Sequence, residues 1–129
     1  MNALLVGIGG AVGSVLRFWI TGLTQGAAAG TTLGVFPVGT LVVNVAGCLL
    51  IGALAQLWEL RSSFSAETRA LLMTGFLGGF TTFSAFANET VAAWRAGAAA
   101  IAALNVVLSV AACVAGVVAG RAAMTALVK

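Results

Sequence analysis

The side chains that could do chemistry in this sequence lie mostly inside long apolar stretches. Asn44 stands in the second stretch, Thr81 and Thr82 in the third, and Asn105 and Ser109 in the fourth. Amide and hydroxyl groups donate and accept hydrogen bonds but carry no charge. In lipid such groups face protein or water, so each indicates a hydrogen bond between helices or a contact with a polar ligand. For Asn44 both interpretations stay open.

The residues that most enzymes and metal centres need are scarce. The sequence contains no His, and its cysteines, Cys48 and Cys113, lie in the middle of separate apolar stretches. A zinc centre and a His-dependent catalytic triad are therefore excluded. The two cysteines need no role beyond that of small apolar residues. We expect the protein not to be an enzyme, and we expect no nucleic-acid partner.

Composition places these polar groups in a membrane. The chain has 129 residues, of which 61% are hydrophobic and 7% charged, whereas a soluble domain carries about 25% charged residues. Four apolar stretches each approach the ~20 residues that cross a bilayer as a helix. They predict an all-α integral membrane protein with one domain, residues 1–129, and four transmembrane helices. The expected spans are 3–23, 38–58, 70–94 and 96–118.

The positive charges are nearly balanced between the two sides of the membrane. With four spans, both termini and the turn near Arg61 share one side, and that side carries four of the six basic residues. Such a weak bias in Lys and Arg does little to orient a membrane protein, so we expect insertion in both orientations. The basic residues on the first side are Arg61, Arg69, Arg121 and Lys129, and those on the other are Arg17 and Arg95.

The third apolar stretch contains a segment, GFLGGFTTFSAF (residues 75–86), that is poor in helix-forming residues. Gly and Thr both disfavour helix. We expect Gly75, Gly78 and Gly79, with the threonines after them, to break the third helix near the bilayer midplane. Broken backbone survives there only where it is buried in protein or lines a cavity. A break frees carbonyl groups for a cation and exposes a helix N-terminus with its positive dipole end.

Two phenylalanines follow this segment. Phe83 and Phe86 lie three residues apart and so on one helical face. Aromatic ring edges carry the positive part of the ring quadrupole and accept an anion at the edge. The alternative is that both rings are ordinary packing residues. A net charge of +3 and an interior with no acid other than Glu89 also suit an anion.

Small residues recur at helical spacing in the first stretch. Gly9 and Gly13 form a small-xxx-small pair, a pattern that usually lets two membrane helices pack closely. We favour packing as the role of these glycines.

Three segments of the chain resemble the signature segments of the Fluc (CrcB) family of fluoride channels. They are GGAVGSVLRF, GTLVVNVAGCLLIG and GFLGGFTTFSAF, and they occur in the family's order across a chain of matching length and plan. The third segment is the most specific of them. The sequence departs from the family's pattern at Ser14, Phe18 and Ala85.

The resemblance implies an antiparallel, dual-topology homodimer in the bacterial inner membrane. Such a dimer has two pores that let fluoride leave the cytoplasm passively, which lowers its toxicity, and a structural sodium ion (Na⁺) on the two-fold axis. By position, the carbonyls of Gly78 and Thr81 match the sodium ligands, and Arg17 matches a first-span arginine for which we expect an electrostatic role. The residues that match the fluoride pore are Asn44, Thr82, Phe83, Phe86 and Ser109.

Two other classes of membrane protein have a similar plan. A small multidrug-type transporter is also a four-span dimer, but it needs a carboxylate in its first span, where this sequence has only Arg17. A membrane subunit with no transport activity would explain the glycines but not a broken third helix.

Overall fold

The computed structural model describes residues 2–61 and 64–128, and every regular element in these ranges is helical. η1 is a short 3₁₀ turn, and η2 is a π-helical segment that leads directly into α4. The elements are α1 (Asn2–Ala28), η1 (Thr32–Val35), α2 (Val38–Arg61), α3 (Ala66–Arg69), η2 (Ala70–Leu77), α4 (Gly78–Phe80), α5 (Phe83–Arg95) and α6 (Ala99–Val128).

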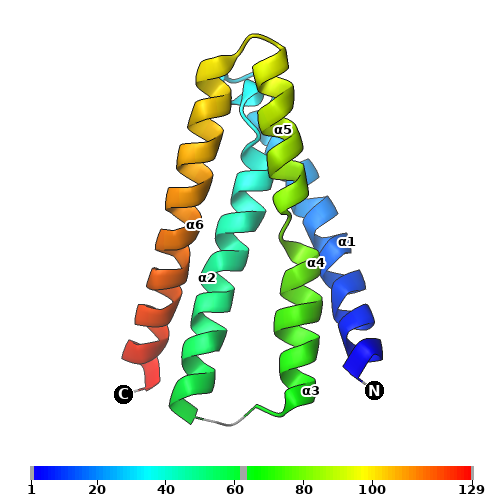
Figure 1. Ribbon diagram of the computed structural model, residues 1–129, viewed down its shortest axis with the longest axis vertical. Helices are drawn as coiled ribbons and strands as arrows, with labels where there is room; N and C mark the ends of the chain where they lie inside the picture. Colours follow the sequence, from blue (N-terminus) through cyan, green and yellow to red (C-terminus); the bar gives the residue numbers. More distant parts are fainter. Residues whose placement is uncertain (1, 62–63, 129) are drawn as a thin grey trace.

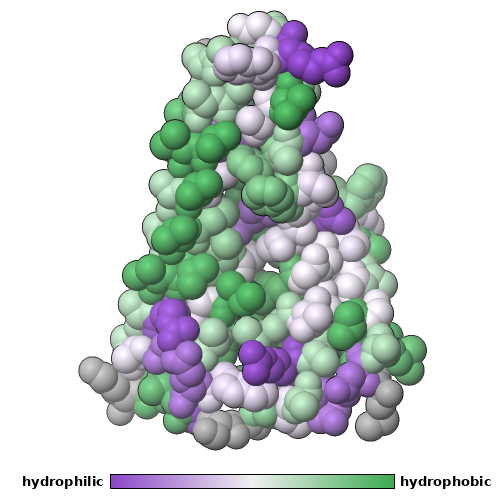
Figure 2. All heavy atoms as spheres, in the orientation of Figure 1, coloured by the Kyte–Doolittle hydropathy of each residue, from purple (hydrophilic) through white to green (hydrophobic). Residues whose placement is uncertain are grey.

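Among the described residues, four helical stretches are long and apolar enough to cross a membrane, which confirms the predicted class. Figure 1 shows that the start of α1 and the end of α6 lie at the same end of the molecule, near α3, with the α5–α6 turn at the opposite end. In Figure 2 hydrophobic residues cover the middle of α6, whereas hydrophilic residues gather mainly towards the two ends. The four stretches are Asn2–Ala28, Val38–Arg61, Ala66–Arg95 and Ala99–Val128.

Helix α1 packs against η2 and α4 with backbone touching backbone. A methyl group added at Gly9 would overlap the carbonyl oxygen of Leu71, and one added at Gly13 would overlap that of Phe76. Both glycines are buried. Because no side chain fits between the two helices here, the structure confirms the packing role that the spacing of Gly9 and Gly13 predicts.

Helices α2 and α6 form the second closely packed pair. Gly52 of α2 and Gly120 of α6 are both buried, and a methyl group at either would overlap a backbone carbonyl of the facing helix. Near the end of this pair, the Arg121 guanidinium binds the Glu59 carboxylate at 2.5 Å. Two polypeptide layers result, α1 with the third span and α2 with α6, and the third span meets both.

The third span leaves helical geometry at two residues. Thr81 has φ −91° and ψ 160°, and Thr82 has φ −152° and ψ 110°, both extended. The glycines expected to interrupt the helix are themselves helical: Gly75 lies in η2, and Gly78 and Gly79 lie in α4. The interruption therefore lies two residues beyond the glycines, at side chains that form hydrogen bonds.

Side-chain hydrogen bonds hold the connection between the first two spans, and three of them involve Gln25. Gln25 donates from Nε2 to the carbonyl oxygens of Gly34 and Phe36, at 3.2 Å each. Its Oε1 accepts from the backbone N–H of Gly39 at 3.2 Å. These bonds satisfy backbone groups around η1 and at the start of α2 that have no helical partner.

Candidate functional site

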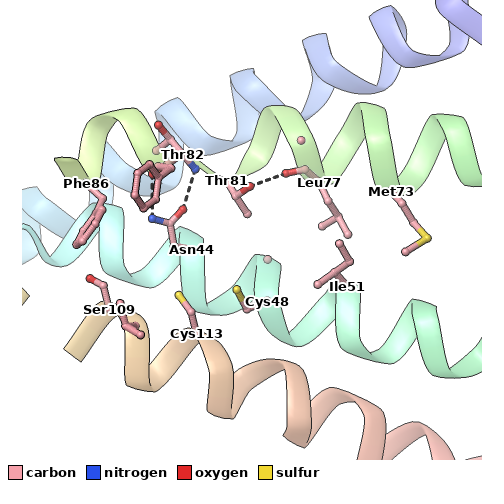
Figure 3. Close-up of a pocket in the computed structure, with 14 residues that line it drawn as sticks. Asn44, Cys48, Ile51, Met73, Leu77, Thr81, Thr82, Phe86, Ser109 and Cys113 are labelled. Atoms are coloured by element: carbon pink, nitrogen blue, oxygen red, sulfur yellow. Dashed lines mark hydrogen bonds between the residues drawn. The ribbon is translucent and has the colours of Figure 1, made fainter. Parts of the chain in front are cut away.

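The side chain of Asn44 pairs with the extended backbone of the third span. Its Oδ1 accepts from the N–H of Thr82 at 2.8 Å, and its Nδ2 donates to the carbonyl oxygen of the same residue at 3.1 Å (Figure 3). An Asn amide carries two N–H donors, so one remains after this pairing. Asn44 therefore forms a hydrogen bond between helices, which was one of the two interpretations of this residue. Its remaining N–H is available for the other, a contact with a polar ligand.

The same pairing removes a hydrogen bond from the end of α4. In an unbroken helix the N–H of Thr82 would donate to the carbonyl of Gly78, four residues earlier. Here it donates to Asn44 instead. Gly78 is exposed, and a methyl group added there would meet nothing within 4 Å. Its carbonyl thus lies without a helical partner at the open surface of the chain.

Helix α5 begins with a side-chain cap. The Oγ1 of Thr82 accepts from the backbone N–H of Ala85 at 3.2 Å, as Thr does at helix N-caps. In a continuous helix that N–H would donate to Thr81, so a second carbonyl at the break also loses its helical partner. The remaining N–H groups of the first turn and the positive dipole end of α5 lie at this point.

The two phenylalanines of the first turns of α5 differ in burial. Their ring centroids are 5.3 Å apart, with the ring planes at 49° to one another. Phe86 is 9% exposed and Phe83 is 78% exposed. Phe86 is therefore also a packing residue within one chain, whereas nothing in the chain covers most of Phe83.

A chain of hydrogen bonds joins α5 to α6. The Nδ2 of Asn105 donates to Thr90 Oγ1 at 2.8 Å, and Thr90 Oγ1 donates to the carbonyl oxygen of Phe86 at 2.8 Å. The hydroxyl of Ser109 donates to Asn105 Oδ1 at 3.2 Å. Asn105 and Ser109 are both buried. Asn105 and Ser109 lie four residues apart and so on one helical face, but nothing in their spacing identified Thr90 as their partner on α5.

One open cavity gathers most of the predicted site residues. It has a volume of about 380 Å³ and lies between α2, the third span and α6. Figure 3 shows the side chains of Asn44, Phe86 and Ser109 at one end of it and those of Ile51 and Met73 towards the other. The predicted residues that line the cavity are Asn44, Gly78, Thr81, Thr82, Phe83, Phe86 and Ser109.

Arg17 does not line this cavity. It borders a neighbouring cavity of about 390 Å³, together with Thr40, Thr82 and Glu89. Thr40 donates to Glu89 Oε1 at 2.7 Å, and within the described residues Arg17 Nε and Glu89 Oε2 are buried without a hydrogen-bond partner. Because Thr82 borders both cavities, the break in the third span lies between them. The bond between Thr40 and Glu89 was not predicted from the sequence.

The chain is similar to proteins of one family along almost its whole length. A family model described as CrcB-like protein, Camphor Resistance (CrcB), matches residues 4–121. A protein of Rhizobium etli named fluoride-specific ion channel FluC is 46% identical over 129 residues, which are 99% of each chain. Proteins with the same name from Rhodospirillum rubrum and Methylococcus capsulatus are 44% and 41% identical. The match covers 88% of this chain in both cases, 86% of the former protein and 48% of the latter.

Proposed function

This chain belongs to the CrcB-like family, and from that premise we propose that it is a multi-pass plasma-membrane channel that conducts fluoride passively out of the cytoplasm. The observation that carries the proposal is the single cavity lined by Asn44, Thr82, Ser109 and the two phenylalanines. Its polar lining consists of neutral amide and hydroxyl groups beside the N-terminus of α5. Such a lining suits an anion, since no carboxylate of the described residues borders it.

Fluoride is small and strongly hydrated, so a pore must replace its water with hydrogen-bond donors. Asn44 offers its second N–H, and the first turn of α5 offers backbone N–H groups with a positive dipole. Ser109 offers its hydroxyl once it turns away from Asn105, to which it donates in the present arrangement. Hydrogen bonds to a charged acceptor are roughly twice as strong as neutral ones, which favours that exchange.

The rings of Phe83 and Phe86 supply the apolar part of the path. Both line the cavity, and an anion approaches a ring edge more favourably than a ring face. Conduction then follows the membrane potential, which is negative inside and drives an anion outwards. Hydrogen fluoride that enters as a neutral acid and dissociates in the cytoplasm would leave by this route as fluoride.

We also propose that two copies assemble as an antiparallel homodimer around a sodium ion. The carbonyls of Gly78 and Thr81 lack their helical partners, and both residues line the open cavity. Unwound backbone carbonyls at broken membrane helices are sodium ligands in other transport proteins. Of the carbonyls that the break leaves without a helical partner, those of Gly78 and Thr81 belong to residues that line this cavity. A second copy raises the number of these oxygens from two to four. The donor set therefore fits the ion, which would hold the two breaks together without moving through the pore.

We further propose that Arg17 raises the local anion concentration at the mouth of the path. Its side chain borders the cavity that adjoins Thr82, and its Nε has no hydrogen-bond partner within the described residues. A cation with low-dielectric walls around it attracts anions from solution.

Efflux from liposomes that contain only this protein tests the function. We expect rapid passive loss of fluoride and almost no loss of chloride, because the glycine-packed helices leave little room for a larger anion. Comparable rates for the two anions would overturn the selectivity. No flux at all would favour a non-transporting subunit, and proton-driven uptake of a cationic dye would favour a multidrug-type transporter.

The dimer and the sodium ion have separate tests. A tag placed after Lys129 should be accessible from both faces of the membrane in similar amounts, and a tag on one face only would exclude the antiparallel dimer. Replacing sodium by a large organic cation during purification should abolish fluoride flux. Full flux in protein stripped of sodium would exclude the structural ion.

A further inference from the structure

The two cysteines of this chain lie side by side on the wall of the cavity. Cys48 follows Asn44 by one turn of α2, and Cys113 follows Ser109 by one turn of α6. Cys48 packs against α6 beside Gly116, where an added methyl group would lie 3.5 Å from the Cys48 Cβ, and Figure 3 shows the sulfur atoms of Cys48 and Cys113 next to one another. Both residues are half-buried and neither is in a disulfide. The sequence had suggested two separate apolar residues.

We propose that Cys48 and Cys113 form a two-thiolate site for a soft, thiophilic metal ion, for which Hg²⁺ is the probe. Each thiol loses its proton to solvent, and each sulfur forms one bond to the metal. One ion therefore binds with the release of two protons and with no change in oxidation state. Thiolate sulfur is the ligand that selects soft metals. Because Cys48 lies on α2 and Cys113 on the adjacent α6, the two residues present two such ligands to one ion.

The surroundings of the thiols decide which metals fit. Zinc in proteins takes four ligands, and within the described residues no group of three or more His, Cys, Asp or Glu could hold a metal. A metal that accepts two ligands in line needs no more than this pair. Two thiolates also neutralise a divalent ion, so the complex brings no net charge into an apolar wall.

The position of the site gives it a consequence for transport. One turn of helix rises about 5.4 Å, so a bound ion lies that distance along the cavity from the level of Asn44 and Ser109. It would fill part of the same open space that those residues line. If the proposed fluoride path is correct, occupation of the thiol pair should block it.

Titration of the purified protein with Hg²⁺ tests the site without reference to transport. We expect one Hg²⁺ per chain to protect both thiols from a thiol reagent and to release two protons. Cys48→Ser and Cys113→Ser should each bind Hg²⁺ at least ~100-fold more weakly. Met73→Leu, which removes the thioether that also lines the cavity, is the matched control and should bind like the parent protein.

Binding of two Hg²⁺ ions per chain, or unchanged affinity in either serine variant, would overturn the paired site. Fluoride efflux is then measured with and without one equivalent of Hg²⁺, and Cys48→Ser should resist the block. If Hg²⁺ binds as expected but no variant conducts fluoride, the proposed function fails while the metal site stands. If fluoride flows and Hg²⁺ binds without blocking it, the site stands and its place on the path is wrong.

Discussion

The two halves of the third span, on either side of Thr81, are attached to the molecule by different means. The first half, Ala66–Phe80, packs on α1 through glycines that allow backbone contact. The second half, α5, is joined to α6 by hydrogen bonds among Thr90, Asn105 and Ser109. The glycine contacts bring no polar side chain to the site, whereas the first turn of α5 offers it backbone N–H groups.

The difference shows how a break survives in an apolar chain. Each half follows its own neighbour, so the residues between them need not be helical. Their backbone groups must nevertheless find partners, because unsatisfied groups are costly in lipid. Asn44 supplies two of those partners at Thr82. Asn44 joins the third span to α2 at the extended residues between the half that packs on α1 and the half that is bonded to α6.

The largest effect is expected at that junction. In Asn44→Asp the second carboxylate oxygen faces the carbonyl of Thr82 in place of a donor, and the charge repels an anion. Two like charges 4 Å apart at an effective dielectric constant of 20 repel by about 4 kcal/mol, so fluoride efflux should fall roughly 1000-fold. Asn44→Ser keeps one donor and should lose less. Efflux from Asn44→Asp equal to that of the parent would show that Asn44 only ties the helices together.

The attachment of the first half is broken by Gly13→Val. A side chain here meets the backbone carbonyl of Phe76, and overpacking against backbone should lower the free energy of unfolding by about 3 kcal/mol. Gly7→Val is the matched control, because Gly7 lies in the same helix with nothing within 4 Å of an added methyl group. Denaturant titration in detergent measures both. Equal stability of the two variants would contradict the close contact.

Substitutions of Phe83 and Phe86 in the second half can distinguish a role in packing from a role in transport. Phe83 is 78% exposed in one chain, so Phe83→Ile should leave the stability of the folded chain within ~0.5 kcal/mol. If its ring edge lines the path, fluoride efflux should still fall at least ~10-fold, a change equivalent to about 1.4 kcal/mol. Phe86→Ile should lose both efflux and stability, because Phe86 is buried. Normal efflux in well-folded forms of both variants would remove the phenylalanines from the path.

The smallest effect is expected where α5 meets α6. Thr90→Val removes the partner of the buried Asn105 amide, which should cost about 1 kcal/mol of stability. Thr74→Val makes the same change on an exposed residue of the first half and should cost less than ~0.5 kcal/mol. Thermal unfolding of the two variants side by side makes the comparison. Identical midpoints would mean that hydrogen bonds do not hold the second half.

Much of the fold follows from local sequence. Long apolar runs predicted four helices, and the spacing of Gly9 and Gly13 predicted their close packing. The prediction that the glycines of the third span break its helix was wrong about the position, since Gly78 and Gly79 are helical. The extended residues are the threonines after them. Helix propensity is a weak local preference that tertiary contacts override. The hydrogen bonds of Thr82 with Asn44 decide where the helix ends.

The residues that line the cavity could be predicted from the sequence better than the hydrogen bonds that join them. Seven residues chosen from two of the motifs and from the fourth apolar stretch line one cavity. The π-helical geometry of η2, the Thr90–Asn105 bond and the Thr40–Glu89 bond were not predicted. Each depends on how two distant segments are rotated against each other, and helical periodicity in one segment carries no such information.

The three hydrogen bonds of Gln25 also bear on the order in which the chain folds during its synthesis. All of them close between residues 25 and 39, so the turn between the first two spans can form before the rest of the second span is made. Other contacts of the two helices must wait, since Gly9 and Gly13 of α1 pack on η2 and Gly52 of α2 packs on α6. Gln25 thus keeps two early helices together until their later partners arrive from the ribosome.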